Sequence, residues 1–156
     1  MNAASEALLG YLFKNIAEKS NIIDGHKVSP GDVLVGLKST GLHTNGYSLA
    51  IKIFTDNGML DKKSDELMNI HKSYLNEIIP HLDKIKGMAH ITGGGLVDNI
   101  PRVLPKGCGV KIDRTWSVPD IFNEIQKYGD VPDSEMFRTF NMGIGFVVIV
   151  DKKDAH

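Results

Sequence analysis

The stretch MAHITGGGLVDNI, residues 88–100, runs from an apolar segment through three consecutive glycines into a second apolar segment. This order predicts a β-strand, a polar Gly-rich loop and a helix. In such a connection the backbone N–H groups of the loop and of the first helical turn point the same way and favour an anion. Glycine lets a phosphate approach the backbone because no Cβ stands in the way. The alternative is a tight turn that packs a helix on a strand, for which one glycine would suffice.

The same order of elements occurs earlier in the chain. VLVGL, residues 33–37, predicts a buried strand, KSTGLHTNG follows as a polar loop, and YSLAIKIFTDNG predicts a helix that begins at Tyr47. Asn45 either caps this helix or belongs to a ligand loop. We expect the amides of both loops to be free and to point at one shared position, where they would hold a doubly charged phosphate ester.

A histidine lies at each of these junctions, His43 within the first loop and His90 at the end of the second strand. An imidazole there can donate to a phosphate or transfer a proton, and a structural hydrogen bond to a backbone carbonyl explains either one equally well. His26, His71 and His81 have no comparable placement. The sequence contains no HExxH motif and no paired-histidine spacing, so we predict no protein-held transition metal.

The remaining segments complete an alternating pattern of helices and strands. Three further helices are predicted, at residues 64–82, 117–129 and 132–140. Two further strands are predicted, at residues 109–113 and 145–150. Ser117 is the expected N-cap of the second of these helices. Strands that alternate with helices predict a layered α/β (α+β) domain with a mixed β-sheet flanked by helices.

Composition limits the function classes. The chain has 156 residues and a formal net charge of −1, and its Lys and Arg are dispersed, which argues against a nucleic-acid or anionic-membrane partner. One cysteine, Cys108, excludes an internal disulfide and favours a reducing cytoplasm. The apolar run at residues 7–13 is too short for a signal peptide or a membrane span.

No self-contained nucleotide site is visible. The patterns GxxxxGK[ST] and GxSxG are absent, and so is GxGxxG between a strand and a helix. A third polar patch, MFRTFNMGIG at residues 136–145, carries Arg138 and Asn141 among apolar side chains, which by itself would indicate a capped helix end. Arg102 follows the glycine loop and suits bidentate anion binding, with a solvated surface arginine as the alternative.

Four segments together carry a resemblance to a known family. GDVLVGLKSTGLHTNGYSL, HITGGGLVDNIPRVLP, WSVPDIFNEIQKYGDVP and MFRTFNMGIGFVVIV closely resemble the C-terminal domain of the phosphoribosylformylglycinamidine cyclo-ligase (AIR synthetase) family. The resemblance runs from about Ile16 to Lys153. The glycine loop by itself marks only the wider superfamily, which includes selenophosphate synthetase and thiamine-monophosphate kinase. NIPRVLP together with FRTFNMGIG is more specific to the cyclo-ligase.

The resemblance implies an ATP-dependent ligase of de novo purine biosynthesis. In that reaction ATP phosphorylates the formyl amide oxygen of formylglycinamidine ribonucleotide, the amidine nitrogen attacks the same carbon, phosphate leaves, and the imidazole ring of aminoimidazole ribonucleotide closes. Mg²⁺ offsets the charge that develops. The resemblance also implies an N-terminal domain that carries most of the ATP and Mg²⁺ groups, faces this domain across the ligand cleft and forms a homodimer.

The resemblance assigns roles to the two loops and to the two later motifs. His43 and His90 are the catalytic candidates for proton transfer. The groups expected to hold the 5′-phosphate and ribose of the substrate are Thr44, Asn45, Gly46, Thr92, Gly93, Gly94, Gly95, Asn99, Arg102, Arg138 and Asn141.

The chain departs from the family pattern in several places. Thr44 replaces a serine, and IHKSY at residues 70–74 puts His71 and Lys72 where threonine and arginine are expected. Residues 1–15 do not match the family and are expected to form an N-terminal arm or helix. Residues 16–156 are expected to form the C-terminal domain, without the ATP-binding domain and without the last helix and strand of the family. We therefore expect the chain alone to be inactive.

Three functions remain open at the level of sequence. The chain is the substrate-binding half of a cyclo-ligase, which meets an ATP-binding domain in cis or in trans. Alternatively, it is a non-catalytic module that holds a phosphorylated metabolite or docks a partner chain. The third is another enzyme of the same superfamily, acting on a different acyl or phosphoryl acceptor.

Overall fold

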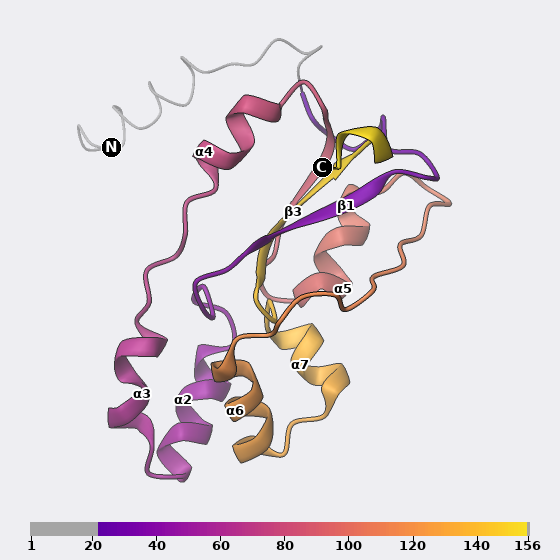
Figure 1. Ribbon diagram of the computed structural model, residues 1–156. Helices are drawn as coiled ribbons and strands as arrows, with labels where there is room; N and C mark the ends of the chain where they lie inside the picture. Colours follow the sequence, from indigo (N-terminus) through magenta and orange to yellow (C-terminus); the bar gives the residue numbers. More distant parts are fainter. Residues whose placement is uncertain (1–21, 156) are drawn as a thin grey trace, which may run out of the picture.

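The computed structural model describes residues 22–155, so the predicted N-terminal arm at residues 1–15 lies outside the described residues (Figure 1). The strands are β1 (Val33–Lys38), β2 (Ile85–His90) and β3 (Ile144–Val150). The α-helices are α2 (Tyr47–Asp56), α3 (Leu60–Leu67), α4 (Leu75–Ile78), α5 (Gly95–Asn99), α6 (Asp120–Gly129) and α7 (Asp133–Thr139). Short 3₁₀ turns cover Ile79–His81, Ile100–Val103 and Lys152–Asp154.

The three strands form one sheet in the order β1-β3-β2, and both neighbouring pairs are antiparallel. The layered α+β class is therefore confirmed, as are the strands predicted at residues 33–37 and 145–150. The predicted mixed sheet is wrong for the described residues, because β3 enters between two strands that both run opposite to it. Residues more than 50 positions apart in the sequence form these pairs, so no local pattern reveals their direction.

This topology brings three connections to the same end of the sheet. Lys38, the last residue of β1, pairs with Ile144, the first residue of β3, and His90, the last residue of β2, pairs with Phe146. The loops that follow β1 and β2 and the turn that precedes β3 therefore meet there. We call this end the loop end of the sheet.

Successive side chains of β3 point to opposite faces of the sheet, and apolar side chains of other segments pack on both faces. Val147 and Ile144 pack with Ile91, Leu96 and Ile100 against α5 and the turn that follows it. On the other face, Val148 packs with Ile85 and Val150, where Phe146 and Ile78 of α4 also contribute. β1 is an edge strand whose apolar residues are only half-buried, so the fully buried strand expected at residues 33–37 is not found.

A second core lies among the helices below the sheet in Figure 1. The apolar stripes of α2 and α6 face each other through Ala50, Ile53, Phe54, Ile121, Phe122 and Ile125. Phe140, at the end of α7, meets Phe122 edge to face with ring centroids 5.9 Å apart. The helices predicted from Tyr47 and over residues 132–140 are confirmed as α2 and α7.

Tertiary contacts override the local pattern in three places. The helix predicted over residues 64–82 is divided into α3 and α4, because Tyr74 is buried between them and its hydroxyl donates to the Lys38 carbonyl at 3.0 Å. The helix predicted over residues 117–129 begins at Asp120, with Pro119 rather than Ser117 at the N-cap position. Nearby, the Trp116 indole N–H donates to the Met142 carbonyl at 2.9 Å and holds the preceding chain in a loop.

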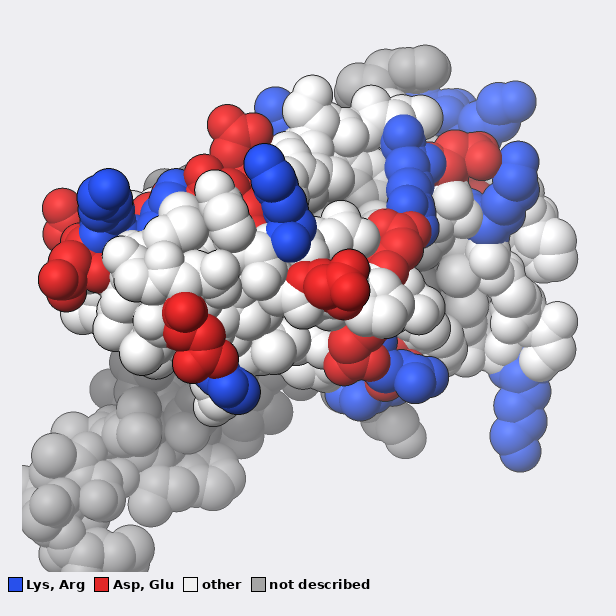
Figure 2. Space-filling view, turned by 90° about the horizontal axis from the view of Figure 1, so that it is seen from below, with Lys and Arg blue, Asp and Glu red and all other residues white. Residues whose placement is uncertain are grey.

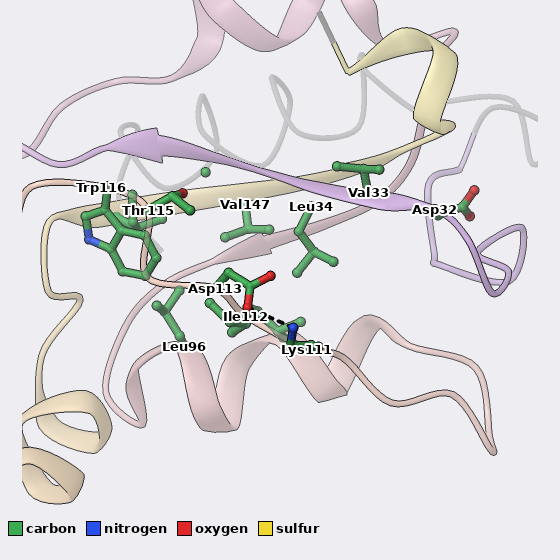
Figure 3. Close-up of a pocket in the computed structure, with 13 residues that line it drawn as sticks. Asp32, Val33, Leu34, Leu96, Lys111, Ile112, Asp113, Thr115, Trp116 and Val147 are labelled. Carbon is green, nitrogen blue, oxygen red and sulfur yellow. Dashed lines mark ion pairs between the residues drawn. The ribbon is translucent and has the colours of Figure 1, made fainter.

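Residues 109–113, predicted as a strand, form no strand in the structure. Figure 3 shows Lys111, Ile112 and Asp113 lying across from the face of the sheet rather than beside an edge strand. They close a cavity of about 480 Å³ whose apolar lining includes Leu34 and Leu96. A segment placed over a sheet face has no ladder of backbone partners, which is why its β-branched pattern does not produce a strand.

Charged side chains of both signs are interspersed over the described face seen from below in Figure 2, without a large patch of one sign. None of the helices within residues 22–155 combines the length and the apolar run that a bilayer crossing needs.

Asn141 fastens the turn before β3 to the loop after β1. Its side chain is fully buried, its amide donates to the Gly41 carbonyl at 2.8 Å, and its carbonyl oxygen accepts from the Ser39 hydroxyl at 3.0 Å and from the Gly143 amide at 2.8 Å. Buried polar groups that lose their partners are costly, so this one side chain supports two connections at the loop end.

We predict that Asn141→Ala lowers the free energy of unfolding by about 3 kcal/mol, because it leaves buried backbone groups of Gly41 and Gly143 without partners. Equilibrium urea denaturation measures the change. Asn123→Ala, on the exposed side of α6, is the matched control and should change the unfolding free energy by less than about 0.5 kcal/mol. Equal effects of the two substitutions would contradict the role given to Asn141.

Candidate functional site at the loop end of the sheet

The candidate site is formed by the connections that meet at the loop end. The Ser39 amide donates to the Gly143 carbonyl at 2.9 Å, and the Ile91 amide donates to the Gly145 carbonyl at 3.0 Å. These bonds continue the sheet pairing beyond β1 and β2. They place the predicted loops at residues 38–46 and 92–95 on either side of the start of β3.

The first loop has an unusual backbone. His43 and Thr44 both have positive φ, 51° and 62°, a conformation that costs a side-chain-bearing residue energy and often occurs at functional sites. The Asn45 amide group donates to the His43 carbonyl at 2.8 Å. Asn45 is therefore not the N-cap of α2, and Gly46 occupies that position in a left-handed conformation. Thr44 is exposed at the top of the loop.

The three glycines of the second loop have different reasons to be there. Gly95 has φ 59°, and a Cβ on it would overlap the Phe137 carbonyl oxygen of α7. Gly94 has φ 101°, and a Cβ would collide with Asp98. Gly93 is exposed and a Cβ on it would meet nothing within 4 Å. Two of the glycines are thus explained by packing, and only Gly93 leaves open space beside its backbone.

The amides of this loop are partly free. The Gly95 amide donates to the Thr92 carbonyl at 2.9 Å, whereas the hydrogen bonds among the described residues include none donated by the amides of Gly93 or Gly94. In the first loop the amides of Ser39, Thr40 and Asn45 donate to the Gly143 carbonyl, to His43 Nε2 and to the Leu42 carbonyl, so the expectation of free loop amides is wrong for these three and for Gly95. That the remaining amides of the two loops point at one shared position stays a prediction.

Asn99 supports the glycine loop from behind. It is 5% exposed, its amide donates to the Gly95 carbonyl at 2.8 Å, and its oxygen accepts from the Thr92 hydroxyl at 3.2 Å. Arg102 is exposed and donates to the same Asn99 oxygen at 3.3 Å. Arg138 is exposed on α7, where it lines a separate cavity with Val97 and Arg114. The structure therefore brings Arg102 to Asn99 behind the glycine loop and places Arg138 at a cavity beside α5, which follows that loop.

Three histidines gather where the two loops approach each other. The rings of His43 and His71 are stacked with centroids 4.0 Å apart, and the Nε2 atoms of His71 and His90 are 3.1 Å apart. The sequence predicted that His43 and His90 lie at equivalent junctions and gave His71 no comparable placement. The structure corrects this prediction for His71, because it lies between the other two histidines. The only sequence signal for His71 was the unusual IHKSY segment, since its approach to His90 depends on the tertiary fold.

His43 is 2% exposed, and its Nε2 accepts the Thr40 amide at 3.0 Å. The proton of the neutral ring is therefore on Nδ1, which has no hydrogen-bond partner among the described residues. Burial, together with the positive charges that His71, His90 and Lys72 can carry, lowers the pKa of His43 to about 4. A buried, neutral imidazole in this position is poorly suited to exchange protons with a ligand.

His90 differs from His43 because its ring reaches the surface. Partial burial lowers its pKa, and the charge of His71 acts in the same direction. Lys72 lies beside the cluster and forms an ion pair with Glu77 at 2.8 Å. Between the two predicted catalytic histidines, the structure thus leaves His90 accessible and encloses His43.

We predict that His43 makes stability depend on pH. Its folded-state pKa lies below the ordinary value of 6.5, so the unfolded chain gains a proton first, and stability falls as pH drops from 6.5 to about 4. The limiting slope is about 1.4 kcal/mol per pH unit. Urea titrations across this range should show a shallower slope for His43→Gln. His81→Gln, at an exposed position, should keep the parental slope, and an unchanged slope in His43→Gln would count against this assignment.

Known proteins resemble this chain over most of its length. It is 48% identical over 148 residues to a phosphoribosylformylglycinamidine cyclo-ligase of Desulfitobacterium hafniense. The matched region covers 88% of this chain and 43% of the relative. Relatives of the same name from Thermoanaerobacter sp. and Geotalea daltonii are 47% and 48% identical, covering 90% of this chain in each case and 45% and 44% of the relatives. The chain thus spans less than half of the length of these relatives.

Residues 29–156 match the family described as AIR synthase related protein, C-terminal domain, and this range includes both loops and all three strands. The chain therefore belongs to the AIR synthase related family, as its C-terminal domain.

Proposed function

We propose that this chain is the substrate-binding part of an ATP-dependent cyclo-ligase that converts formylglycinamidine ribonucleotide into aminoimidazole ribonucleotide. The observation that carries the proposal is identity of 47–48% to proteins named phosphoribosylformylglycinamidine cyclo-ligase across about nine-tenths of the chain. The meeting of two strand-to-helix loops at one end of the sheet supports it.

In this proposal the 5′-phosphate and ribose of the substrate bind at the exposed surface of the two loops. The amides of Gly93 and Gly94 donate to phosphate oxygens. The hydroxyls of Thr92 and Thr44, which in this structure donate to Asn99 and to the His43 carbonyl, turn to the phosphate when it binds. Arg102 contributes positive charge from the rim of the second loop. Gly46, Gly95, Asn45 and Asn99 hold the loop backbones in place, as does Asn141 from within the sheet end.

His90 is the proposed proton-transfer group of the pair His43 and His90. The His90 ring is exposed, whereas His43 is enclosed with Nε2 already accepting a backbone hydrogen bond. A general acid or base must reach the reacting group directly or through one water. His43 then acts by positioning the first loop, and Arg138 contributes positive charge from α7, where it lines a cavity with Val97.

ATP and Mg²⁺ are proposed to bind mainly on a domain outside this chain, supplied in cis or in trans, which also forms the homodimer. Mg²⁺ would offset charge on the transferred phosphoryl group. We place the enzyme in the cytoplasm, since its one cysteine and its proposed role in purine biosynthesis suit a reducing compartment.

A chimera tests the activity. We predict that replacing the C-terminal part of the D. hafniense relative by residues 22–156 gives an enzyme with ATP-dependent formation of aminoimidazole ribonucleotide, and that this chain alone gives none. The unmodified relative is the control for assay conditions. A folded, inactive chimera that binds the ribonucleotide no better than other phosphate esters by calorimetry would favour the non-catalytic module.

A glycine substitution tests where the phosphate binds. In the chimera, Gly93→Val should raise the KM for the ribonucleotide at least tenfold (about 1.4 kcal/mol) and leave the melting temperature unchanged, since its Cβ meets no protein atom within 4 Å. Gly109→Val is the matched control, because Gly109 is exposed with equally open space and lies outside the loops. An unchanged KM for Gly93→Val would place the phosphate elsewhere.

A further inference from the structure

The proposed reaction gives a role to His90 but none to His71, so it does not explain why these two rings meet. His71 comes from the extended segment between α3 and α4, and His90 ends β2. Their Nε2 atoms are 3.1 Å apart, their ring centroids are 5.0 Å apart, and the rings are inclined by 54°. Both residues are exposed, so solvent ions can reach the point where the two nitrogens face each other.

We propose that His71 and His90 are a two-imidazole chelate for a borderline transition-metal cation such as Zn²⁺. Imidazole nitrogens bind Zn²⁺ at about 2.0–2.1 Å, so two of them in a tetrahedral site lie about 3.3 Å apart. The observed Nε2 separation is within a few tenths of an ångström of that value. The cation takes the place of the proton that now joins the two nitrogens, and each ring turns so that its Nε2 lone pair points at the metal instead of at the other nitrogen.

The surroundings hold both rings in place before the metal binds. His71 is stacked on His43 with an interplanar angle of 19°, and His43 is itself fixed by the Thr40 amide. His90 lies on β2 with its ring stacked near Phe146, at a centroid distance of 5.9 Å. Ligands that are already oriented lose less side-chain entropy on binding, which favours chelation over binding to a single surface histidine.

The chemistry of the site selects the class of cation. Within residues 22–155 no three His, Cys, Asp or Glu side chains form a metal-binding group, so water completes the coordination shell. Imidazole suits Zn²⁺, Ni²⁺ and Cu²⁺, whereas Mg²⁺ and Ca²⁺ require oxygen ligands. The positive charge of Lys72 is offset by its ion pair with Glu77. Sequence spacing missed this pair, because 19 residues separate the two histidines.

The test is calorimetric titration of the full chain with Zn²⁺ at pH 7.5, together with long-range ¹H–¹⁵N NMR of the histidine rings. We expect one Zn²⁺ per chain, with shifts at the Nε2 atoms of His71 and His90. His71→Thr should weaken Zn²⁺ binding at least tenfold and abolish the His90 shift. His81→Thr is the matched control, since His81 is also exposed but lies outside the pair.

Zn²⁺ bound at Nε2 of His90 would occupy an atom of the proposed proton-transfer group and so would block the reaction. The binding test itself needs no substrate and no cyclo-ligase activity, so the two proposals can fail separately. Circular dichroism of His71→Thr checks that the fold is retained, and His90→Gln provides a second variant that removes the other ligand. Absence of Zn²⁺ binding, equal affinity in the His71→Thr chain, or shifts at other histidines would each overturn the chelate.

Discussion

Insertion of β3 between β1 and β2 is the constraint on which the rest of the structure depends. Because β3 is antiparallel to both neighbours, the last residues of β1 and β2 and the first residue of β3 lie at one end of the sheet. Five of the seven residues of β3 are buried apolar residues of the core, namely Ile144, Val147, Val148, Ile149 and Val150. The burial that stabilises this strand therefore also brings the polar loops together.

Two buried asparagines convert this packing into a defined arrangement of the loops. Asn141 joins the turn before β3 to the loop after β1, and Asn99 holds the backbone of the glycine loop. Because these side chains satisfy the buried carbonyl groups, the exposed loop surface is left available to a ligand. Gly95 adds a steric requirement, since α7 packs directly on its backbone. The glycine loop is thus supported on its buried side by Asn99 and α7, while Gly93 on its other side is exposed.

Burial separates the three clustered histidines chemically. His43 is enclosed and held neutral, whereas His71 and His90 reach the surface with their Nε2 atoms facing each other. The enclosed ring supports the first loop and stacks against His71, and the exposed rings are free to meet protons, anions or cations. The cluster therefore contains one structural histidine, His43, and two accessible ones, His71 and His90. The difference follows from how deeply each side chain is buried.

The sequence by itself determined the elements whose signals are local. The apolar runs of β1 and β3, the helix from Tyr47 and the glycine loop follow from periodicity and turn residues, and the motifs around them identified the family. Only the tertiary structure decided the strand directions, the loss of the strand expected at residues 109–113, and the approach of His71 to His90. The physical reason is that pairing, burial and hydrogen bonding join residues far apart in the chain. For the same reason the packing need of Gly95 became visible only when α7 was in place.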